Sequence, residues 1–94
     1  MLIFTYNENM NKIEWKRKAL KQVNKFDHQY RVKVFDAVEC LCDLDTCSNI
    51  KRLTNHEYDY RLRVGSYRVF FDLIDGEITI VEIQEVKKRD DRTY

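Results

Sequence analysis

The first half of the chain alternates between polar and apolar positions with two different periods. Residues 12–15 alternate one by one, as the side chains of a short strand do. From residue 17 to residue 25 the apolar positions Ala19, Leu20 and Val23 recur at helical spacing, and Phe26 closes that face. This part of the sequence therefore predicts a short strand followed directly by a helix.

A second helix is expected after a short turn. Asp27 is a suitable N-terminal cap, and the apolar stripe that follows it continues to about residue 44. The positions of this stripe are Tyr30, Val34, Ala37, Val38 and Leu41. Two consecutive helices joined by a short turn form a helical hairpin. Residues 45–56 are mostly polar, with Ile50 and Leu53 as apolar anchors, and they are expected to form a loop that leads into the sheet.

The second half of the chain changes to the two-residue period of strands. Between residues 58 and 64 one face is apolar, and the other carries Asp59, Arg61 and Arg63. The apolar positions are Tyr58, Tyr60, Leu62 and Val64. We expect this strand to bury its apolar face and to leave the arginines on an open one.

Both glycines of the chain stand where hairpins require them. Gly65 and Ser66 suit a two-residue turn with glycine first, and Asp75 with Gly76 is a strong hairpin signal. These turns delimit two further strands, at residues 67–74 and from residue 77 to about 86. Strand 67–74 is apolar on both faces apart from Arg68 and Asp72, and the last strand is so at its start. Both are therefore expected to be central.

The order of these elements predicts an α+β fold. Its sheet is small and antiparallel, the element order is β-α-α-β-β-β, and the two N-terminal helices pack on one face of the sheet. The other face is expected to be at least partly open. Residues 1–94 are expected to form a single domain, because this length supports one modest core. Within it, residues 1–9 are expected to be an N-terminal extension, with Met10 as an alternative start.

Composition narrows the class of protein. A hydrophobic share of 44% with 13% aromatic residues is too apolar for a disordered chain. No apolar run approaches the roughly 20 residues that span a bilayer. The first residues lack both a basic region and a small-residue cleavage site, so they do not resemble a signal peptide. We therefore expect a cytoplasmic protein that does not bind membranes.

The three cysteines, Cys40, Cys42 and Cys47, leave an odd one over in any pairing. Cys40 and Cys42 lie two residues apart on an expected helix, so their side chains point in different directions and cannot easily share a metal. Adding His56 as a fourth ligand gives a spacing that matches no common zinc site. The expectation is reduced thiols in a reducing compartment, with no metal.

The formal net charge is only +1, so a nucleic-acid site would have to come from the distribution of charge. Arg61 and Arg63 share a strand face, and the hairpin turn brings Arg68 back beside them, about 5 Å away across the strands. Three guanidinium groups so close together repel one another unless they bind anions or are neutralised by Asp59 and Asp72. The alternative interpretation is a solvated sheet face with Arg–Asp pairs.

The C-terminal tail adds to this positive surface. Lys87, Lys88, Arg89 and Arg92 extend it, whereas Asp90 and Asp91 dilute it. Tyr94 supplies a ring that could stack on a base, or a phenol that could bond a phosphate or move a proton. The alternative is a frayed, solvated terminus.

Such a surface is chemically suited to cleaving RNA without a metal. The 2′-OH can attack its own phosphodiester, provided that the protein stabilises the charge of the transition state and moves two protons. Arginines supply the charge but titrate too high to move protons at neutral pH, which leaves Tyr94, His56 or a lysine. A lone histidine is more often a surface residue. Glu82 and Glu85 are expected on opposite faces of the last strand, so they do not form a glycosidase pair.

Several of these segments together resemble a known family. They are Ile13-Glu14-Trp15, Lys18-Ala19-Leu20-Lys21, Lys51-Arg52-Leu53, the hairpin sequence YRLRVGSYR and the ending KKRDDRTY. From about Met10 onward the chain resembles the RelE/ParE superfamily of bacterial type II toxins. The likeness is closest to the RelE branch, the ribosome-associated mRNA endonucleases.

The resemblance implies a RelE-like microbial RNase fold and a function as an mRNA interferase. Such a toxin cleaves mRNA in the ribosomal A site without metal or other cofactor, and a cognate antitoxin that wraps the toxin inhibits it. The motifs shared with the family imply catalytic roles for Arg61, Arg68, Arg89 and Tyr94. The residues expected to bind RNA are Arg63, Lys51, Lys87, Lys88 and Arg92.

One residue departs from the family pattern. Where RelE-type strands often carry a lysine two residues before the basic position of the second strand, this chain has Asp59. A carboxylate there opposes phosphate binding, or accepts a proton in a different way. Two alternatives therefore stay open: a ParE-like toxin that inhibits DNA gyrase and cuts no RNA, and an inactive relative that only binds its antitoxin.

Overall fold

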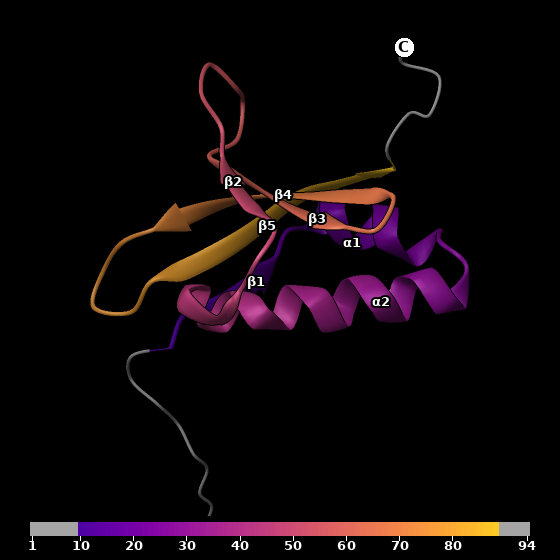
Figure 1. Cartoon of the computed structure of the whole chain (residues 1–94), viewed down its shortest axis with the longest axis horizontal. Coiled ribbons are helices and arrows are strands. Elements are labelled where there is room, and N and C mark those ends of the chain that lie inside the picture. The colour runs from indigo at the N-terminus through magenta and orange to yellow at the C-terminus, as the bar shows by residue number, and fades with distance from the viewer. Residues whose placement is uncertain (1–9, 89–94) are drawn as a thin grey trace, which may run out of the picture.

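The computed structural model describes residues 10–88, which form one mixed sheet and two helices. The elements are β1 (Lys12–Trp15), α1 (Arg17–Asn24), α2 (His28–Glu39), the short 3-10 turns η1 (Cys40–Cys42) and η2 (Leu44–Thr46), β2 (Ile50–Arg52), β3 (Tyr60–Val64), β4 (Tyr67–Ile74) and β5 (Ile80–Lys88). The predicted α+β class is confirmed (Figure 1). No helix in residues 10–88 is long and apolar enough to cross a membrane.

The sheet has five strands in the order β1-β5-β4-β3-β2, one more than predicted. The three pairings among β2, β3, β4 and β5 are antiparallel, as expected, whereas β1 runs parallel to β5. The extra strand is β2, which lies inside the expected loop 45–56. A strand of only three residues is too short to show an alternating pattern, and only Ile50 of it packs against the core. Lys51 and Arg52 therefore belong to an edge strand.

The second helix is shorter than predicted. It ends at Glu39, and the chain continues through the two 3-10 turns. Asp43 adopts an extended backbone between them, and its side chain accepts a hydrogen bond from the amide of Asp45 at 3.2 Å. Such local bonds compete with helix continuation. At the other end of α2, Asp27 does occupy the cap position, but its side chain makes no capping bond.

The turns also bring two cysteines together. Cys40 and Cys47 have their Cα atoms 5.7 Å apart and form a disulfide, while Cys42 is a free, half-buried thiol. The expectation that all three are reduced is therefore wrong for this pair. It rested on the odd number of cysteines and on a reducing compartment, and it did not foresee that η1 and η2 fold the chain back on itself.

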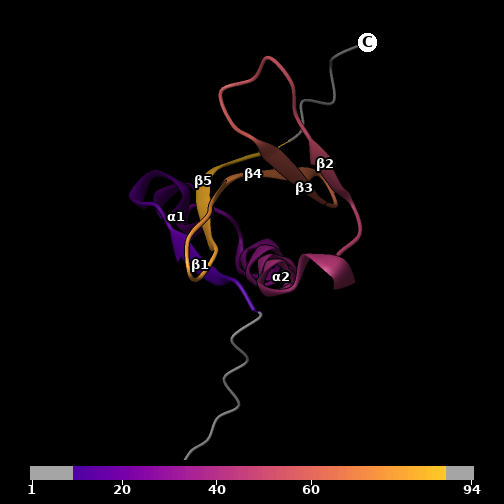
Figure 2. The same ribbon diagram turned by 90° about the vertical axis from the view of Figure 1, so that its left-hand side faces the viewer.

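One hydrophobic core lies between the sheet and the helices. Ala19 and Val23 of α1 and Val34 and Val38 of α2 are fully buried in it, together with Phe71 at the middle of β4. Figure 2 shows the sheet curving around α2, with α1 beside β5. Here the side chain of Gln22 accepts a hydrogen bond from the amide of Val86 at 2.7 Å. Helix α1 thus covers the edge of β5 beyond the end of the short strand β1.

The β3–β4 hairpin has the predicted turn. Gly65 has φ = 57°, while Ser66 is not among the residues with positive φ, as a glycine-first turn requires. The β4–β5 hairpin is also present, but Ile74 pairs with Ile80, so residues 75–79 form a longer connection than the two residues expected. The prediction that these two strands are central is confirmed, because β4 is the middle strand and β5 lies inside the sheet.

A bulge in β5 changes which side chains share a face. Phe70 pairs with Glu85 and Phe71 pairs with Ile83, so Gln84 is an extra residue without a partner in β4. A bulge of this kind shifts the alternation by one residue. Glu82 and Glu85 consequently lie on the same face of the sheet, and the prediction that they lie on opposite faces is wrong.

Candidate functional site

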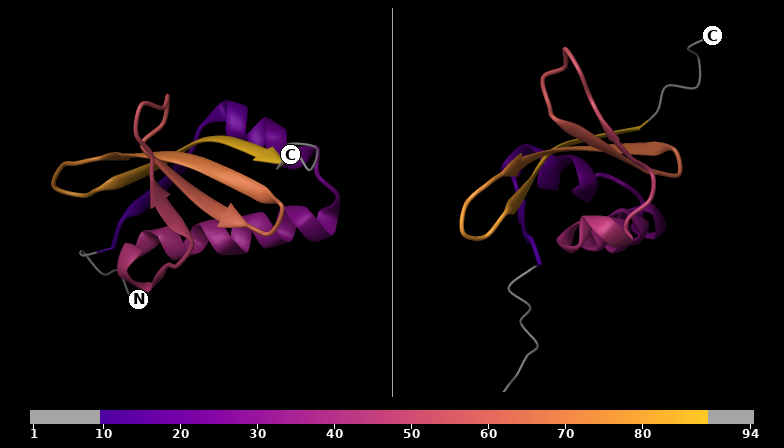
Figure 3. Two further views of the ribbon diagram at one scale, coloured as in Figure 1. Left: turned by 45° about the horizontal axis from the view of Figure 1, so that its top comes forward. Right: turned by 60° about the vertical axis from the view of Figure 1, so that its left-hand side comes forward.

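The sheet face turned away from α2, called the outer face below, carries a straight row of cations. Arg63 of β3 pairs directly with Arg68 of β4, which pairs in turn with Lys87 of β5. Their neighbours Leu62, Val69 and Val86 are buried in the core, so these three side chains point outward. We call Arg63, Arg68 and Lys87 the basic row. The prediction that the hairpin places Arg68 beside the arginines of the preceding strand is confirmed. Figure 3 shows the hairpin of β3 and β4 from two further sides.

A second row of outward side chains lies next to the basic row. Lys51 pairs with Arg61, Arg61 with Phe70, and Phe70 with Glu85. Burial lowers the pKa of Arg61 below its ordinary value, and the charges of Arg63 and Arg68 lower it further. The Nε atoms of Arg61 and Arg68 are buried and have no hydrogen-bond partner among residues 10–88. The arginines thus repel one another, and a bound anion would relieve that repulsion.

The neighbouring carboxylates do not neutralise these arginines. Asp72 accepts hydrogen bonds from the backbone amide of Asp59 at 2.8 Å and from the side chain of Gln84 at 3.2 Å. Within residues 10–88 every ion pair joins a lysine to Glu82 or Glu85. The Arg–Asp pairs of the alternative interpretation are therefore not formed in this part of the chain. Asp59 itself is exposed.

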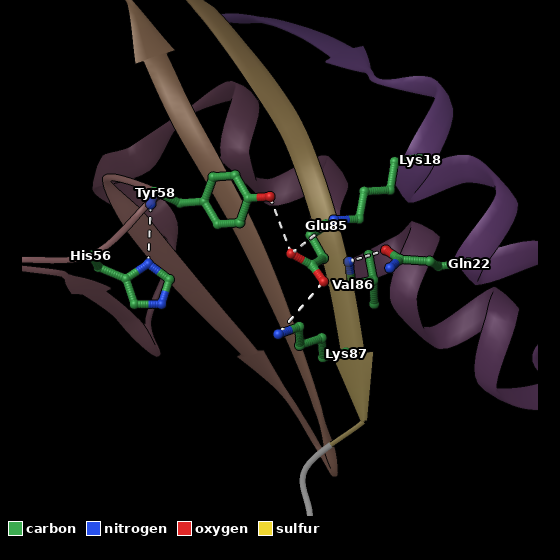
Figure 4. Close-up of polar contacts among 7 residues, drawn as sticks. All are labelled: Lys18, Gln22, His56, Tyr58, Glu85, Val86 and Lys87. Carbon is green, nitrogen blue, oxygen red and sulfur yellow. Dashed lines mark hydrogen bonds and ion pairs between the residues drawn. The ribbon is translucent and has the colours of Figure 1, made fainter.

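Glu85 is a buried carboxylate beside the basic row, only 6% exposed. The hydroxyl of Tyr58 donates to its Oε1 at 3.1 Å, and the ammonium groups of Lys18 and Lys87 lie 3.5 and 3.6 Å from its oxygens (Figure 4). Burial alone would raise the pKa of Glu85, but the bond from Tyr58 and the charges of Lys87 and Lys18 outweigh it and lower the pKa. Glu85 therefore stays ionised and holds Lys87 at the end of the row.

The loop between β2 and β3 folds over the outer face and rises away from α2 (Figures 1 and 2). It carries Tyr58 onto Phe70, with the ring centroids 5.7 Å apart. The expectation that Tyr58 shares the core face of its strand is thus wrong, because β3 begins only at Tyr60. The ring of His56 lies parallel to that of Phe70, and its Nδ1 accepts a hydrogen bond from the amide of Tyr58 at 3.0 Å.

The structure brings together five of the nine residues proposed from sequence. Arg61, Arg63, Arg68, Lys51 and Lys87 share the outer face. Lys88 pairs with Tyr67, whose side chain belongs to the core cluster, so Lys88 lies on the opposite face. Arg89, Arg92 and Tyr94 lie outside the described residues.

Sequence reasoning missed Tyr58 and Glu85, and it considered His56 only as a base or as a zinc ligand. The single sequence signal for Glu85 is its place in the last strand between apolar residues and two residues before Lys87. The place of Tyr58 and His56 depends on the path of an irregular loop, which no periodicity encodes.

Comparisons with known proteins agree with this architecture. The model of the family described as the ParE toxin of the type II toxin–antitoxin system parDE matches residues 13–92. No curated protein matches the chain in sequence.

Solved structures with a similar fold are toxin–antitoxin complexes. A chain of the RelBE2 complex of Mycobacterium tuberculosis is 22% identical, with a TM-score of 0.69, covering 85% of this chain and 99% of that chain. A chain of the archaeal RelE–RelB complex of Pyrococcus horikoshii is 16% identical, with a TM-score of 0.70, covering 87% and 98%. A chain of the Methanococcus jannaschii RelB–RelE complex is 21% identical, with a TM-score of 0.58, covering 79% and 87%.

The family match spans nearly the whole chain, and the arrangement of helices and strands is that of the RelE complexes. The superfamily predicted from the sequence is therefore confirmed. This chain belongs to the ParE toxin family, within the RelE/ParE superfamily of type II toxin–antitoxin toxins.

Proposed function

We propose that this toxin is an endoribonuclease that cleaves mRNA, in the ribosomal A site, and so inhibits translation in the cytoplasm. The observation that carries the proposal is the basic row together with Arg61. Its arginines have no carboxylate partner within residues 10–88 and keep two buried Nε donors unpaired. Guanidinium groups bind phosphate through paired donors, so a phosphodiester fits this surface better than a neutral ligand does.

In the proposed reaction the row supplies charge, and other groups move protons. Arg61 and Arg68 stabilise the negative charge that builds on the phosphate as the 2′-OH attacks. Arginine stays protonated at neutral pH and does not serve as a base. By resemblance to the family, Arg89 and Tyr94 complete the site from the tail that follows Lys88. Lys51, Arg63, Lys87 and Arg92 are proposed to hold the RNA backbone. Lys88 lies on the opposite face of the sheet and is left out of this proposal.

A cognate antitoxin is the proposed protein partner. The similar solved structures are complexes of RelE with RelB, the antitoxin that accompanies it. An acidic segment of such a partner would meet the same unpaired arginines as RNA does. Neutralising the basic row would block the proposed site.

The nuclease proposal is tested by inducing the toxin in cells and mapping the 5′ ends of coding sequences by primer extension. We expect new 5′ ends within open reading frames for the wild type. Arg68→Ala is expected to reduce their number by about 100-fold, the usual effect of losing one group that stabilises transition-state charge. Arg52→Ala is the matched control, because Arg52 lies in the same sheet but pairs with Tyr60, a residue packed against the core. Absence of new 5′ ends with the wild type would sink the nuclease proposal.

A second candidate function is inhibition of DNA gyrase. The family model that matches is that of ParE, and Asp59 replaces the lysine expected for the RelE branch. This function predicts intact mRNA, a DNA-damage response on induction and loss of supercoiling by purified gyrase. The same induced cultures thus discriminate the two functions.

A further inference from the structure

We propose that His56, stacked on Phe70, is a platform for one unpaired base of a single-stranded RNA whose phosphate lies on the basic row. This inference rests on the proposed nuclease function and names the way in which that site holds its substrate. It also assigns a role to an irregular loop that the proposed reaction does not use.

The two rings form a stack at the surface. The centroids of His56 and Phe70 are 5.2 Å apart, and the ring planes differ by only 15°. Phe70 is 7% exposed, whereas His56 is exposed, so the ring face that remains open belongs to His56. Every base has a π face, so stacking on an aromatic ring is tolerant of sequence.

The histidine ring is held in place before any ligand arrives. Its Nδ1 accepts the amide of Tyr58 at 3.0 Å, which leaves Nε2 to carry the proton in the neutral form (Figure 4). Tyr58 is in turn buried, packs on Phe70 and donates to Glu85. Asn55, at φ = 52°, adopts the left-handed backbone that asparagine tolerates and turns the loop. A preorganised ring loses less entropy on binding than a mobile one does.

Phe70, on which His56 stacks, lies close to the basic row in the sheet. Phe70 follows Arg68 by two positions along β4, and its partner Arg61 precedes Arg63 by two positions along β3. Two residues of a strand span about 7 Å. A phosphate on the basic row and a base on His56 can therefore belong to the same or to adjacent nucleotides.

Charge favours a base over a second phosphate at this place. Glu85 pairs with Phe70, and Asp72 and Glu82 lie on the next outward positions of β4 and β5. Asp72 has no lysine partner within residues 10–88 and repels phosphate, whereas Glu82 and Glu85 are paired with lysines. None of the three repels the face of a neutral base. The base must be unstacked from its neighbours to reach the ring, so the ligand is single-stranded RNA.

The test measures binding of two fluorescent oligonucleotides to the purified full chain at one fixed ionic strength. One is a short single-stranded RNA with 2′-O-methyl riboses, which cannot be cleaved, and the other has the same backbone without bases. We expect the wild type to bind the base-bearing strand more tightly. His56→Ala is expected to weaken that binding by about tenfold, in the range of one lost base stack, and to leave the abasic strand unchanged.

Two further variants separate stacking from fold effects. His56→Phe keeps an aromatic ring but removes the Nδ1 acceptor, so we expect it to retain most of the affinity lost in His56→Ala. The matched control is His28→Ala, since the other histidine of the chain is exposed at the start of α2. That change is expected to have no effect on either oligonucleotide.

The possible failures are distinguishable. Equal weakening of both strands by His56→Ala, no weakening, or equal wild-type affinity for both strands would overturn the platform and leave the nuclease proposal standing. A wild type that binds neither strand would also overturn the platform, whereas the RNA-cleaving function is overturned by the absence of new 5′ ends in induced cells.

Discussion

At the scale of single residues, the outer face depends on one buried carboxylate. Glu85 receives a hydrogen bond from Tyr58 and ion pairs from Lys18 and Lys87. Burial raises the pKa of Tyr58 to about 12, with its hydrogen bond to Glu85 as the next cause. The two groups therefore stabilise one another as neutral phenol and ionised carboxylate across the neutral pH range.

Removing the phenol hydroxyl tests this pair. We expect Tyr58→Phe to lower the free energy of unfolding at pH 7 by about 1–3 kcal/mol, because a buried carboxylate loses a hydrogen-bond donor. The measurement is urea denaturation followed by circular dichroism. Tyr30→Phe is the matched control, because Tyr30 is 39% exposed, and we expect it to change stability little.

The pH dependence of that difference has a definite sign. The pKa of Glu85 is lowered in the folded state, so its stabilising effect is present above the unfolded pKa and disappears as the pH falls through the folded value. The pKa of Tyr58 is raised, so its effect is present below the unfolded value and disappears as the pH rises towards 12. Wild type and Tyr58→Phe should therefore differ most near neutral pH and converge at both extremes. A difference that is constant with pH would contradict the coupling of the two groups.

At the scale of elements, the alternation of the sequence was sufficient for the β3–β4 hairpin. A two-residue period and a glycine with positive φ determine the register, and the register determines that Arg63 faces Arg68. Most core positions of both helices also followed from their period, as Val34 and Val38 illustrate. Leu20 and Tyr30 of the predicted apolar faces, however, are exposed.

Other features of the same elements cannot be predicted from the sequence of a single segment. The bulge that extrudes Gln84 depends on how β4 and β5 fit together, and it reverses the predicted relation of Glu82 to Glu85. The short strand β2 forms only because β3 offers it an edge, and the parallel pairing of β1 depends on the chain returning through both helices. These are tertiary effects, which override what a single segment encodes.

The contact between α1 and β5 gives a prediction at this scale. The side-chain oxygen of Gln22 accepts the amide of Val86 at 2.7 Å. We expect Gln22→Ala to lower the free energy of unfolding by about 1–2 kcal/mol, because that amide loses its partner, and to increase hydrogen exchange at Val86. Gln29→Ala makes the same chemical change on the exposed surface of α2 and is expected to be nearly neutral. Equal effects of the two changes would show that the contact contributes nothing specific.

At the scale of the whole molecule, a net charge of +1 conceals a polarised surface. The basic row and Arg61 occupy one end of the outer face, and Asp72 and Glu82 lie towards the other. Glu85 lies between them, in the same cross-strand row as Arg61. The net charge therefore gave no indication of nucleic-acid binding. The alternation of polar and apolar side chains along single strands, in contrast, located the arginines. Because those arginines repel one another, the stability of the folded chain is expected to rise when an anion binds among them.

Millimolar pyrophosphate is expected to raise the melting temperature of the wild type relative to sodium chloride of the same ionic strength. An anion that binds only the folded chain stabilises it by mass action, and about 1 kcal/mol corresponds to roughly 4–8 °C in a domain of this size. Arg68→Gln should abolish the rise and, without pyrophosphate, should be at least as stable as the wild type, since it relieves the repulsion on Arg61. Arg52→Gln, an arginine of the same sheet outside the row, should keep the full rise. If all three proteins gained equally in differential scanning fluorimetry, the gain would come from general ion effects, and the basic row would not be an anion site.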